Sequence, residues 1–588
     1  MDCNKILKFF LIRGRLSAFD MPKTTPMPTP RFDHYYRYTE LSDLLGSLAA
    51  AHPSLMRVAS IGKSHEGRDI WLATLTRFDA GDDRDKPGFW VDGNLHAPEL
   101  AGSSACLYFI HALLSGYGHE PDITRCLDSR VFYICPRINP DGAEWALADA
   151  PRIIRSSTRP YPYDELGVGG LIREDMDGDG RILSMRIPDR DGPWKISERD
   201  PRLLVPREPA EQGGQYYRLL PEGRLEDYDG YLIQVQPVKE GLDLNRNFPA
   251  EWRNEAEQKG AGPYPASEPE VRAVVEFISN HKNICGGVAF HTYSGVLLRP
   301  LSYRDDDELA PEDLWTYRKL GDKGTVLTGY PAASTYHEFR YHPKEIITGA
   351  LDDWLYEQQG LFAWTVEIWS PQREAGIENY RFIDWYRDHP EEDDLKLLEW
   401  NDDVLEGKGF VDWYPFEHPQ LGRVELGGWN PLFSFWNPPP RLLEQEVRRF
   451  PQWLVWHALL SPELAVELTA EALGNDSYLV RVVVTNRGWL PTYITKQALV
   501  KKLVRGVVCE ITLPDAATLA QGQRRVELGQ LEGRAHKPAS TFGWAGTVTD
   551  PTDHRAKTEW VVRAAPGAQI EVTARHPRAG GVRRVITV

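Results

Sequence analysis

Cysteine is scarce in this chain of 588 residues, and long hydrophobic runs are missing. The six cysteines are scattered over positions 3, 106, 126, 135, 285 and 509, and no two form a CxxC pair. Neither a disulfide scaffold nor a zinc site built from thiolates is therefore supported. No apolar run approaches the roughly 20 residues that span a bilayer, so the sequence predicts no membrane-spanning helix.

Positive charge is also in short supply. The chain has 68 Lys and Arg against 85 Asp and Glu, a formal net charge of −17. Because phosphates bind to positive surfaces, this balance argues against general binding of nucleic acid or of anionic membranes. What the chain does hold is 41% hydrophobic residues, with 19 Trp and 25 Tyr, a composition typical of folded globular proteins.

The first 32 residues are expected to form a flexible N-terminal extension. Lys5–Ile12 combines basic residues with a short apolar stretch and faintly resembles a signal peptide. However, Lys8 interrupts the stretch, and no clear small-x-small cleavage site follows. We therefore expect a cytoplasmic protein, with secretion as the alternative.

Residues 33–400 alternate short apolar strands with helices. This alternation predicts an α/β domain with a mixed, mostly parallel central sheet flanked by helices. Residues 159–231, rich in Pro, Gly, Asp and Arg and without sustained periodicity, are expected to be an irregular insertion. After a connecting segment at 401–459, alternating runs at 478–485, 558–563 and 569–574 predict an all-β, sandwich-like domain over 460–588.

A histidine and a carboxylate stand three residues apart in His96-Ala-Pro-Glu99, directly after an apolar strand. His291 follows another apolar strand, 287–290, in the same way. Ligands bind at such strand ends in open α/β sheets, and hydrolytic zinc needs rigidly held ligands with one open position for water. The HxxE spacing also occurs at His342 and His389, so spacing alone is weak evidence. Surface or packing histidines are the alternative.

Seven motifs in one order make residues 35–400, outside the insertion, resemble the zinc carboxypeptidases of the carboxypeptidase A/B type (the funnelin family). One match would carry little weight, whereas seven in the family's order, at strand or helix ends, are a strong signal. The resemblance implies a zinc carboxypeptidase-like fold. The motifs are Glu66-Gly-Arg68, His96-Ala-Pro-Glu99, Asn139-Pro-Asp-Gly142, Asp243-Leu-Asn-Arg-Asn-Phe248, Ser267-Glu-Pro-Glu270, His291-Thr-Tyr-Ser294 and Thr365-Val-Glu-Ile368.

By this resemblance, His96, Glu99 and His291 are the ligands of one catalytic zinc ion. Two histidines and one glutamate also suit hydrolytic zinc on chemical grounds. Glu367 matches the family's general base and lies in an apolar strand, where desolvation would raise the carboxyl pKa toward neutrality. The alternative for Glu367 is a structural carboxylate paired with an arginine.

The resemblance also implies residues that bind the substrate. Asn245 and Arg246 match the pair that holds its terminal carboxylate, a task that suits a guanidinium because it can donate two parallel hydrogen bonds. Arg155 resembles the arginine that polarises the scissile carbonyl and stabilises the oxyanion. Its spacing is one residue longer than in the family, and Arg152 is the competing assignment.

The side-chain pocket departs from the family pattern. Tyr293 matches a pocket tyrosine, but alignment on Asp353-Trp354 puts Glu345 where the mobile active-site tyrosine belongs, so Tyr341 is only a candidate for that role. Asp352 occupies the position that favours Lys or Arg in carboxypeptidases specific for basic residues. The alternative is that Asp352 is a helix N-terminal residue stabilised by the helix dipole.

The insertion carries an acidic loop. Asp175, Asp177 and Asp179 stand at positions 1, 3 and 5 with Gly180 at position 6, a pattern that suits calcium. Position 12 is Arg186 and not the Glu of an EF-hand, so a calcium ion would need other ligands. An Asp/Gly turn is the alternative.

The sequence therefore predicts a zinc metallocarboxypeptidase that hydrolyses the C-terminal peptide bond of peptides or proteins, with zinc-bound water as nucleophile. A rival of the same class is a specialised amidohydrolase on this scaffold, such as a peptidoglycan stem-peptide peptidase or a deglutamylase. A rival of another class is a non-catalytic binding protein. Loss of a ligand or of the base would indicate the latter, but all four residues are present.

Overall fold

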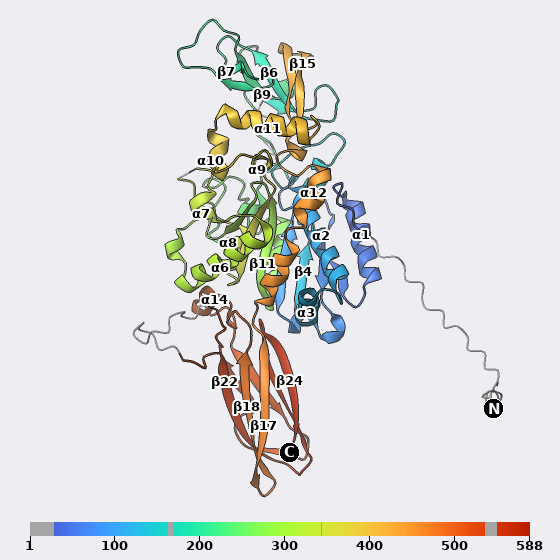
Figure 1. Ribbon diagram of the computed structural model, residues 1–588, viewed down its shortest axis with the longest axis vertical. Coiled ribbons are helices and arrows are strands. Elements are labelled where there is room, and N and C mark those ends of the chain that lie inside the picture. Colours follow the sequence, from blue (N-terminus) through green and yellow to red (C-terminus); the bar gives the residue numbers. More distant parts are fainter. Residues whose placement is uncertain (1–28, 163–168, 343, 536–549) are drawn as a thin grey trace, which may run out of the picture.

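Three regions follow one another along the long axis of the molecule (Figure 1). The computed structural model describes residues 29–162, 169–342, 344–535 and 550–588. A central α/β region lies between a small β region at one end and a β-sandwich at the other. The expected N-terminal extension lies outside the described residues up to position 28, and Phe32, at its end, is buried in the central core.

An eight-stranded mixed sheet forms the centre, in the order β1-β2-β4-β3-β11-β14-β12-β13. Its four middle strands, β4, β3, β11 and β14, run parallel. They are buried along their whole length, which explains their continuous apolar sequences. The strands are β1 (Met56–Lys63), β2 (Asp69–Leu75), β3 (Gly88–Gly93), β4 (Val131–Cys135), β11 (Ile284–Thr292), β12 (Val296–Arg299), β13 (Ala332–Ser334) and β14 (Phe362–Ile368).

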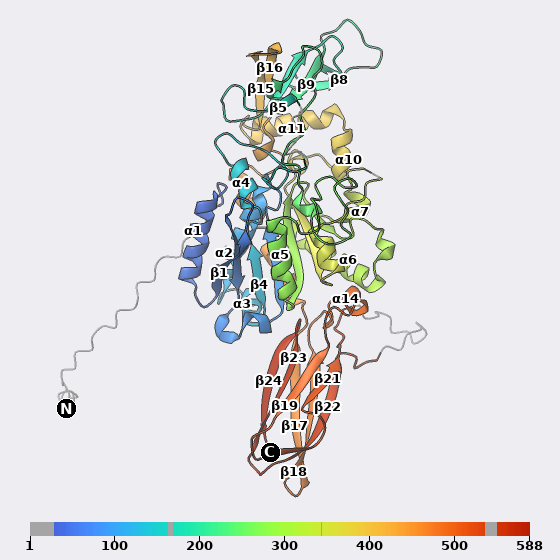
Figure 2. The same ribbon diagram turned by 180° about the vertical axis from the view of Figure 1, so that it is seen from behind.

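Helices cover both faces of this sheet (Figure 2), which confirms the expected α/β class. Successive residues of β3 point to opposite faces: Phe89 and Val91 join the core under α2 and α13, and Trp90 joins the core under α5 and α8. The helices of this region are α1 (Tyr38–Ala51), α2 (Leu100–Gly116), α3 (Pro121–Ser129), α4 (Pro140–Ala146), α5 (Pro269–Asn280), α6 (Pro311–Thr328), α7 (Thr335–Glu338), α8 (Leu351–Glu357), α9 (Pro371–Glu374), α10 (Phe382–Arg387), α11 (Glu391–Val404), α12 (Pro440–Val447) and α13 (Pro451–Leu459).

The insertion is not irregular, as the sequence predicted, but contains six short strands. Four of them join β15 and β16, from the expected connecting segment, in a six-stranded sheet of order β15-β16-β6-β9-β7-β8. The same segment supplies α12 and α13, which pack on the central core. These strands are β5 (Gly170–Arg173), β6 (Ser184–Pro188), β7 (Trp194–Ile196), β8 (Leu204–Pro206), β9 (Tyr217–Pro221), β10 (Gly223–Glu226), β15 (Phe410–His418) and β16 (Gly422–Trp429).

The C-terminal region consists of two four-stranded antiparallel sheets, which confirms the expected all-β class. Their inner faces share one core, to which Val482 and Trp560 contribute from one sheet and Val572 from the other. The short helix α14 (Lys496–Val500) lies near the central region (Figure 1). The strands are β17 (Leu464–Gly474), β18 (Ser477–Asn486), β19 (Val507–Thr512), β20 (Thr518–Gln521), β21 (Arg525–Gly529), β22 (Arg555–Arg563), β23 (Gln569–His576) and β24 (Gly580–Thr587).

Candidate metal centre and active site

The three predicted metal ligands lie at the carboxyl ends of two neighbouring parallel strands. The loop after β3 carries His96, and Glu99 is the residue directly before the first turn of α2. His291 is the penultimate residue of β11, which pairs with β3. Because parallel strands end at the same edge of a sheet, the two histidines meet although 195 positions separate them.

Close packing between β3 and α2 holds the first two ligands in place. A Cβ atom at Gly93 would lie 2.5 Å from the carbonyl of Gly102, so the helix can approach the strand end this closely only because the strand ends in glycine. The residues between Gly93 and Glu99 are buried between this strand end and α2. This packing restricts the movement of His96 and Glu99.

The ligand atoms converge on one point. His96 Nδ1 lies 2.8 Å from Glu99 Oε1, His291 Nδ1 lies 2.9 Å from Glu99 Oε2, and the two Nδ1 atoms are 3.1 Å apart. All three side chains are buried. Two imidazoles and one carboxylate facing a common centre suit a divalent cation and leave a fourth tetrahedral position for water. The donor set therefore fits one zinc ion.

Asp243 orients His96 from behind. One carboxylate oxygen lies 3.1 Å from His96 Nε2, a contact that directs Nδ1 toward the metal position, and the other lies 3.1 Å from Arg155 Nε. Burial by itself raises the pKa of Asp243, but the charges of Arg155, Arg246 and His96 outweigh it and hold this pKa well below its usual range. Asp243 belongs to a motif recognised in the sequence, but no role was predicted for it. The one signal for such a role was its position two residues before the predicted substrate-binding residue Asn245.

Glu367 stands beside His291 on the adjacent strand. The two residues are register partners in the β11–β14 pair. Burial raises the pKa of Glu367 to about 8, the direction that its apolar strand predicts. Among the described residues it forms no ion pair, so the expected alternative of a structural carboxylate paired with an arginine is not observed.

Arg155, and not Arg152, faces the ligands. Its Nη1 lies 3.3 Å from Glu99 Oε1, and 41% of its side chain remains exposed to the space above. The Arg152 guanidinium points elsewhere, toward Glu240 at 3.1 Å, and stacks over the Trp145 ring. Of the two arginines, Arg155 is therefore the one placed to contact a molecule at the metal centre.

Asn245 and Arg246 lie in the short 3-10 turn η3 (Leu244–Arg246), just after Asp243. The side-chain oxygen of Asn245 accepts a hydrogen bond from the Leu351 backbone N–H at 2.9 Å. Arg246 Nη1 donates to the Asn245 carbonyl at 2.8 Å. Neither residue forms a wall of the open cavity described next, so their role in binding a carboxylate stays a prediction.

A cavity of about 520 Å³ opens above the ligands. Glu99, Arg155 and Glu367 line it together with Tyr293, the predicted pocket tyrosine. Tyr341, the candidate for the mobile tyrosine, also lines it and is half-exposed, with the charges of Arg155 and Glu367 close enough to act on its hydroxyl. The cavity therefore brings an acid–base group, a cation and aromatic rings around the metal position.

Tyr386 is a wall residue that the sequence did not predict. It lies in α10, its hydroxyl accepts a hydrogen bond from Gln372 Nε2 at 2.6 Å, and its ring centre is 5.6 Å from that of Tyr293. Nothing in the surrounding sequence indicates this position, because α10 follows the last motif of the family resemblance.

Asp352 is buried in the first turn of α8 and is not a wall of the cavity. Burial raises the pKa of its carboxyl. Its neighbour Asp353 accepts a hydrogen bond from the Ser302 backbone N–H at 3.0 Å. The position matches the helix-start alternative, and a preference for basic side chains stays a prediction.

The expected calcium loop does not bring its three carboxylates together. Oxygens of Asp175 and Asp177 lie within 4.8 Å of Glu222, whereas Asp179 turns away to pair with Arg181. The Asp175 carboxylate accepts backbone N–H groups from its own loop at 2.7 and 2.8 Å, as in an Asp/Gly turn. Glu222 likewise accepts two backbone N–H groups. The described residues therefore give no support for a calcium ion.

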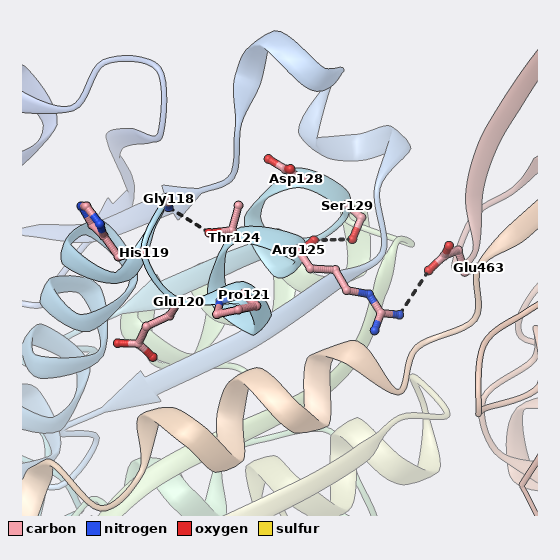
Figure 3. A pocket seen from close by; sticks show the side chains of 9 residues that line it. All are labelled: Gly118, His119, Glu120, Pro121, Thr124, Arg125, Asp128, Ser129 and Glu463. Atoms are coloured by element: carbon pink, nitrogen blue, oxygen red, sulfur yellow. Dashed lines mark hydrogen bonds and ion pairs between the residues drawn. The ribbon is translucent and has the colours of Figure 1, made fainter.

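A further hollow of about 540 Å³ lies far from these residues, where α3 meets the C-terminal domain (Figure 3). Arg125 points toward Glu463 across it, at 3.9 Å. None of the predicted site residues lines this hollow, so it contributes nothing to the metal centre.

No described helix has both the length and the apolar character needed to cross a membrane.

Comparison with curated proteins finds carboxypeptidases. Carboxypeptidase A6 of Mus musculus is 25% identical over 281 residues, 46% of each chain, so this chain spans about half the length of that relative. Carboxypeptidase A1 of Rattus norvegicus is 22% identical over 382 residues, 63% of this chain and 69% of the relative. The zinc carboxypeptidase of Saccharothrix mutabilis subsp. capreolus is 36% identical over 114 residues, 19% of this chain and 26% of the relative.

Solved structures show a weaker overall likeness. The thrombin activatable fibrinolysis inhibitor matches with a TM-score of 0.37 and 20% identity over 58% of this chain and 67% of its own. Carboxypeptidase A of Helicoverpa armigera matches with a TM-score of 0.37 and 19% identity over 63% of this chain and 72% of its own.

At the C-terminus, residues 464–587 match a domain of unknown function (DUF8731). The zinc carboxypeptidase family model matches residues 41–384, more than half of the chain, and this protein therefore belongs to the zinc carboxypeptidase family.

Proposed function

We propose that the protein is a zinc-dependent carboxypeptidase that hydrolyses the C-terminal peptide bond of peptides or proteins. The observation that carries the proposal is the convergence of His96, Glu99 and His291 beside a cavity that Glu99 and Glu367 line. Zinc, when bound, supplies a Lewis acid and lowers the pKa of a water molecule. The other tasks fall to residues of the chain.

Glu367 takes the proton of the attacking water and then passes it to the leaving amine. A general base works best when its pKa lies near the working pH, and burial brings the Glu367 carboxyl into that range. Arg155 donates to the scissile carbonyl oxygen and stabilises the negative charge that develops there. This task suits Arg155 because part of its guanidinium faces the cavity while Asp243 and Glu99 fix its position.

Asn245 and Arg246 bind the free carboxylate of the substrate and so restrict cleavage to the chain end. In support, Arg246 is held 3.9 Å from Asp243, the residue that also contacts His96 and Arg155. The group that recognises the chain end is thereby tied to the groups that act on the peptide bond. A bidentate guanidinium–carboxylate contact would discriminate strongly against amidated ends.

Mass spectrometry of a mixed peptide pool tests the proposal. The pool contains free and amidated C-termini ending in Lys, Arg, Phe, Leu and Glu, incubated with the zinc-loaded protein. We expect stepwise release of single residues from free ends only, and none with Glu367→Gln. The C-terminal residues released also measure the expected preference due to Asp352. If no member of the pool is cleaved, the broad peptidase is rejected in favour of the specialised amidohydrolase.

A further inference from the structure

A second cavity of about 670 Å³ adjoins the one above the metal centre. Its other walls come from the insertion, from Arg152, from residues 236, 237 and 239, and from Trp429 and Pro431 at the end of β16. The space above Glu367 therefore continues into a compartment enclosed by parts of the chain outside the family motifs. The two cavities share the wall residues Ile153, Ile154, Arg173, Val238, Glu240 and Trp436.

The proposed roles of the site residues indicate which part of a peptide would reach this compartment. Neither Asn245 nor Arg246 lines it, whereas residues 152–154, directly before Arg155, do. In the proposed function a peptide is held by its C-terminal carboxylate at Arg246, with its scissile carbonyl at Arg155. Because Ile153 and Ile154 line both cavities, such a peptide would run upstream along them, and the residues before the scissile bond would occupy the second cavity.

Two of the cations in this compartment are neutralised by the protein itself. Arg152 pairs with Glu240 at 3.1 Å. Arg224 pairs with Glu174 at 2.7 Å and with Glu226 at 2.6 Å. Because both arginines already form ion pairs with carboxylates of the protein, neither is available to bind an acidic group of a substrate.

Two other cations have no such partner. Within the described ranges of the chain, Arg173 and Lys239 form no ion pair, and both side chains are exposed. Arg173, the last residue of β5, lines both cavities, whereas Lys239 lines only the second. The passage between the cavities therefore carries an unneutralised guanidinium, with Ile172 and Trp436 as apolar neighbours in the wall.

We propose that Arg173 binds an acidic side chain of the substrate upstream of the scissile bond, so that the protein favours peptides with Asp or Glu at that position. The inference rests on the proposed carboxypeptidase function, which supplies the direction of the bound peptide. A guanidinium suits the task because it meets a carboxylate with two donors. Because Arg173 is exposed, solvent screens the pair and the selectivity is modest.

Pentapeptides with a blocked N-terminus and a free C-terminus, identical except for Glu or Gln at one position, test this inference. The substitution is placed in turn at each of the three positions before the scissile bond, with one constant C-terminal residue. At one position we expect kcat/KM to be about three- to fivefold higher for Glu than for Gln, the size expected of one exposed ion pair. The ratio should approach one in 0.5 M NaCl, because salt screens exposed charges.

Three variants assign the effect to Arg173. In Arg173→Gln the Glu/Gln ratio should fall to one, and in Arg173→Glu a Lys peptide should be favoured over the Glu peptide. Arg224→Gln is the matched control, because it removes a wall cation that is already paired and should keep the wild-type ratio. A ratio of one at all three positions in the wild type, or an undiminished ratio in Arg173→Gln, overturns the inference.

The two proposals fail in different ways. If a blocked dipeptide is cleaved while every Glu/Gln ratio is one, the carboxypeptidase stands and the role of Arg173 is rejected. If no peptide is cleaved, fluorescein-labelled Glu and Gln pentapeptides are titrated with zinc-loaded wild type and Arg173→Gln. Tighter binding of the Glu peptide by the wild type alone still supports Arg173, whereas equal affinities or no binding reject it.

Discussion

At the scale of single residues, Asp243 connects His96 of the candidate metal centre to Arg155 and Arg246. Its two oxygens contact His96 Nε2 and Arg155 Nε, each at 3.1 Å. An amide in its place would keep the shape but lose the charge that favours the required histidine tautomer. The motif was readable in the sequence, but the contact was not, because His96 lies 147 positions away.

We expect Asp243→Asn to lower zinc affinity by about 10- to 100-fold, the usual effect of removing a residue that orients a metal ligand. Competition against a zinc-binding dye, on protein stripped with a chelator, measures this. Asp306→Asn is the control, since the Asp306 side chain is 12% exposed, as is that of Asp243, and pairs with Arg299 away from the metal centre. Equal losses in both variants would mean that the effect is general destabilisation.

The buried His457 makes stability depend on pH. It lies in α13, and neither ring nitrogen has a hydrogen-bond partner among the described residues. Burial lowers its pKa to about 3, from 6.5. Between these values the unfolded chain binds a proton that the folded chain does not. The free energy of unfolding is therefore not reduced by His457 above pH 6.5. It decreases as the pH falls from 6.5 toward 3, by at most about 1.4 kcal/mol per pH unit.

We expect His457→Leu to flatten this dependence, because the unfolded variant has no imidazole to protonate. Guanidinium unfolding at pH 7, 6, 5 and 4 gives the slope. His119→Leu, which removes an exposed histidine, should behave like the wild type. A slope in His457→Leu equal to that of the wild type would contradict the assignment.

At the scale of elements, strands that carry a readable pattern were predictable and the others were not. β3 and β14 are continuous apolar runs, and β23 alternates along its length. β7 and β8 have three residues each, which is too few for an alternating hydrophobic pattern to be recognised. The outer sheet is also held together by pairing between β6 and β16, where Arg186 and Glu425 meet across 239 positions.

We expect Met185→Ala to destabilise this outer sheet by about 2–5 kcal/mol, since Met185 is fully buried against Val424 and Leu426. Hydrogen exchange should accelerate in β6, β9 and β16 but not in β3 and β11, because the outer sheet has its own small core. Leu219→Ala, at an exposed position of β9, should change little. Equal acceleration in β3 and β11 would show that the two sheets unfold as one unit.

At the scale of the whole molecule, Arg578 connects the C-terminal sandwich to the central region. It lies buried between β23 and β24, and its Nη1 donates to the carbonyls of Gly360 at 3.1 Å and Tyr493 at 2.9 Å. Its own carbonyl accepts a hydrogen bond from Cys285 Sγ at 3.1 Å. One guanidinium thus satisfies carbonyls on both sides of the contact between the two regions.

We expect Arg578→Met to cost about 2–3 kcal/mol, because buried carbonyls lose a charged donor. Since these bonds cross between the two regions, calorimetry should show the C-terminal domain melting before the rest. Arg583→Met, at an exposed position of β24, is the control and should leave the profile unchanged. An unchanged profile in Arg578→Met would mean that other contacts hold the regions together.

Both fold classes, and the three residues that converge at the candidate metal centre, could be predicted from the sequence. The placement of His96, Glu99, His291 and Glu367 was predictable because these residues stand in apolar strands or shortly after them. Both the strand and the motif are written in a few consecutive residues. Three findings needed the folded chain: Arg155 and not Arg152 faces the ligands, Tyr386 lines the cavity, and Arg173 lies between two compartments. Those outcomes depend on contacts between segments far apart in the chain, and no local period or spacing encodes such contacts.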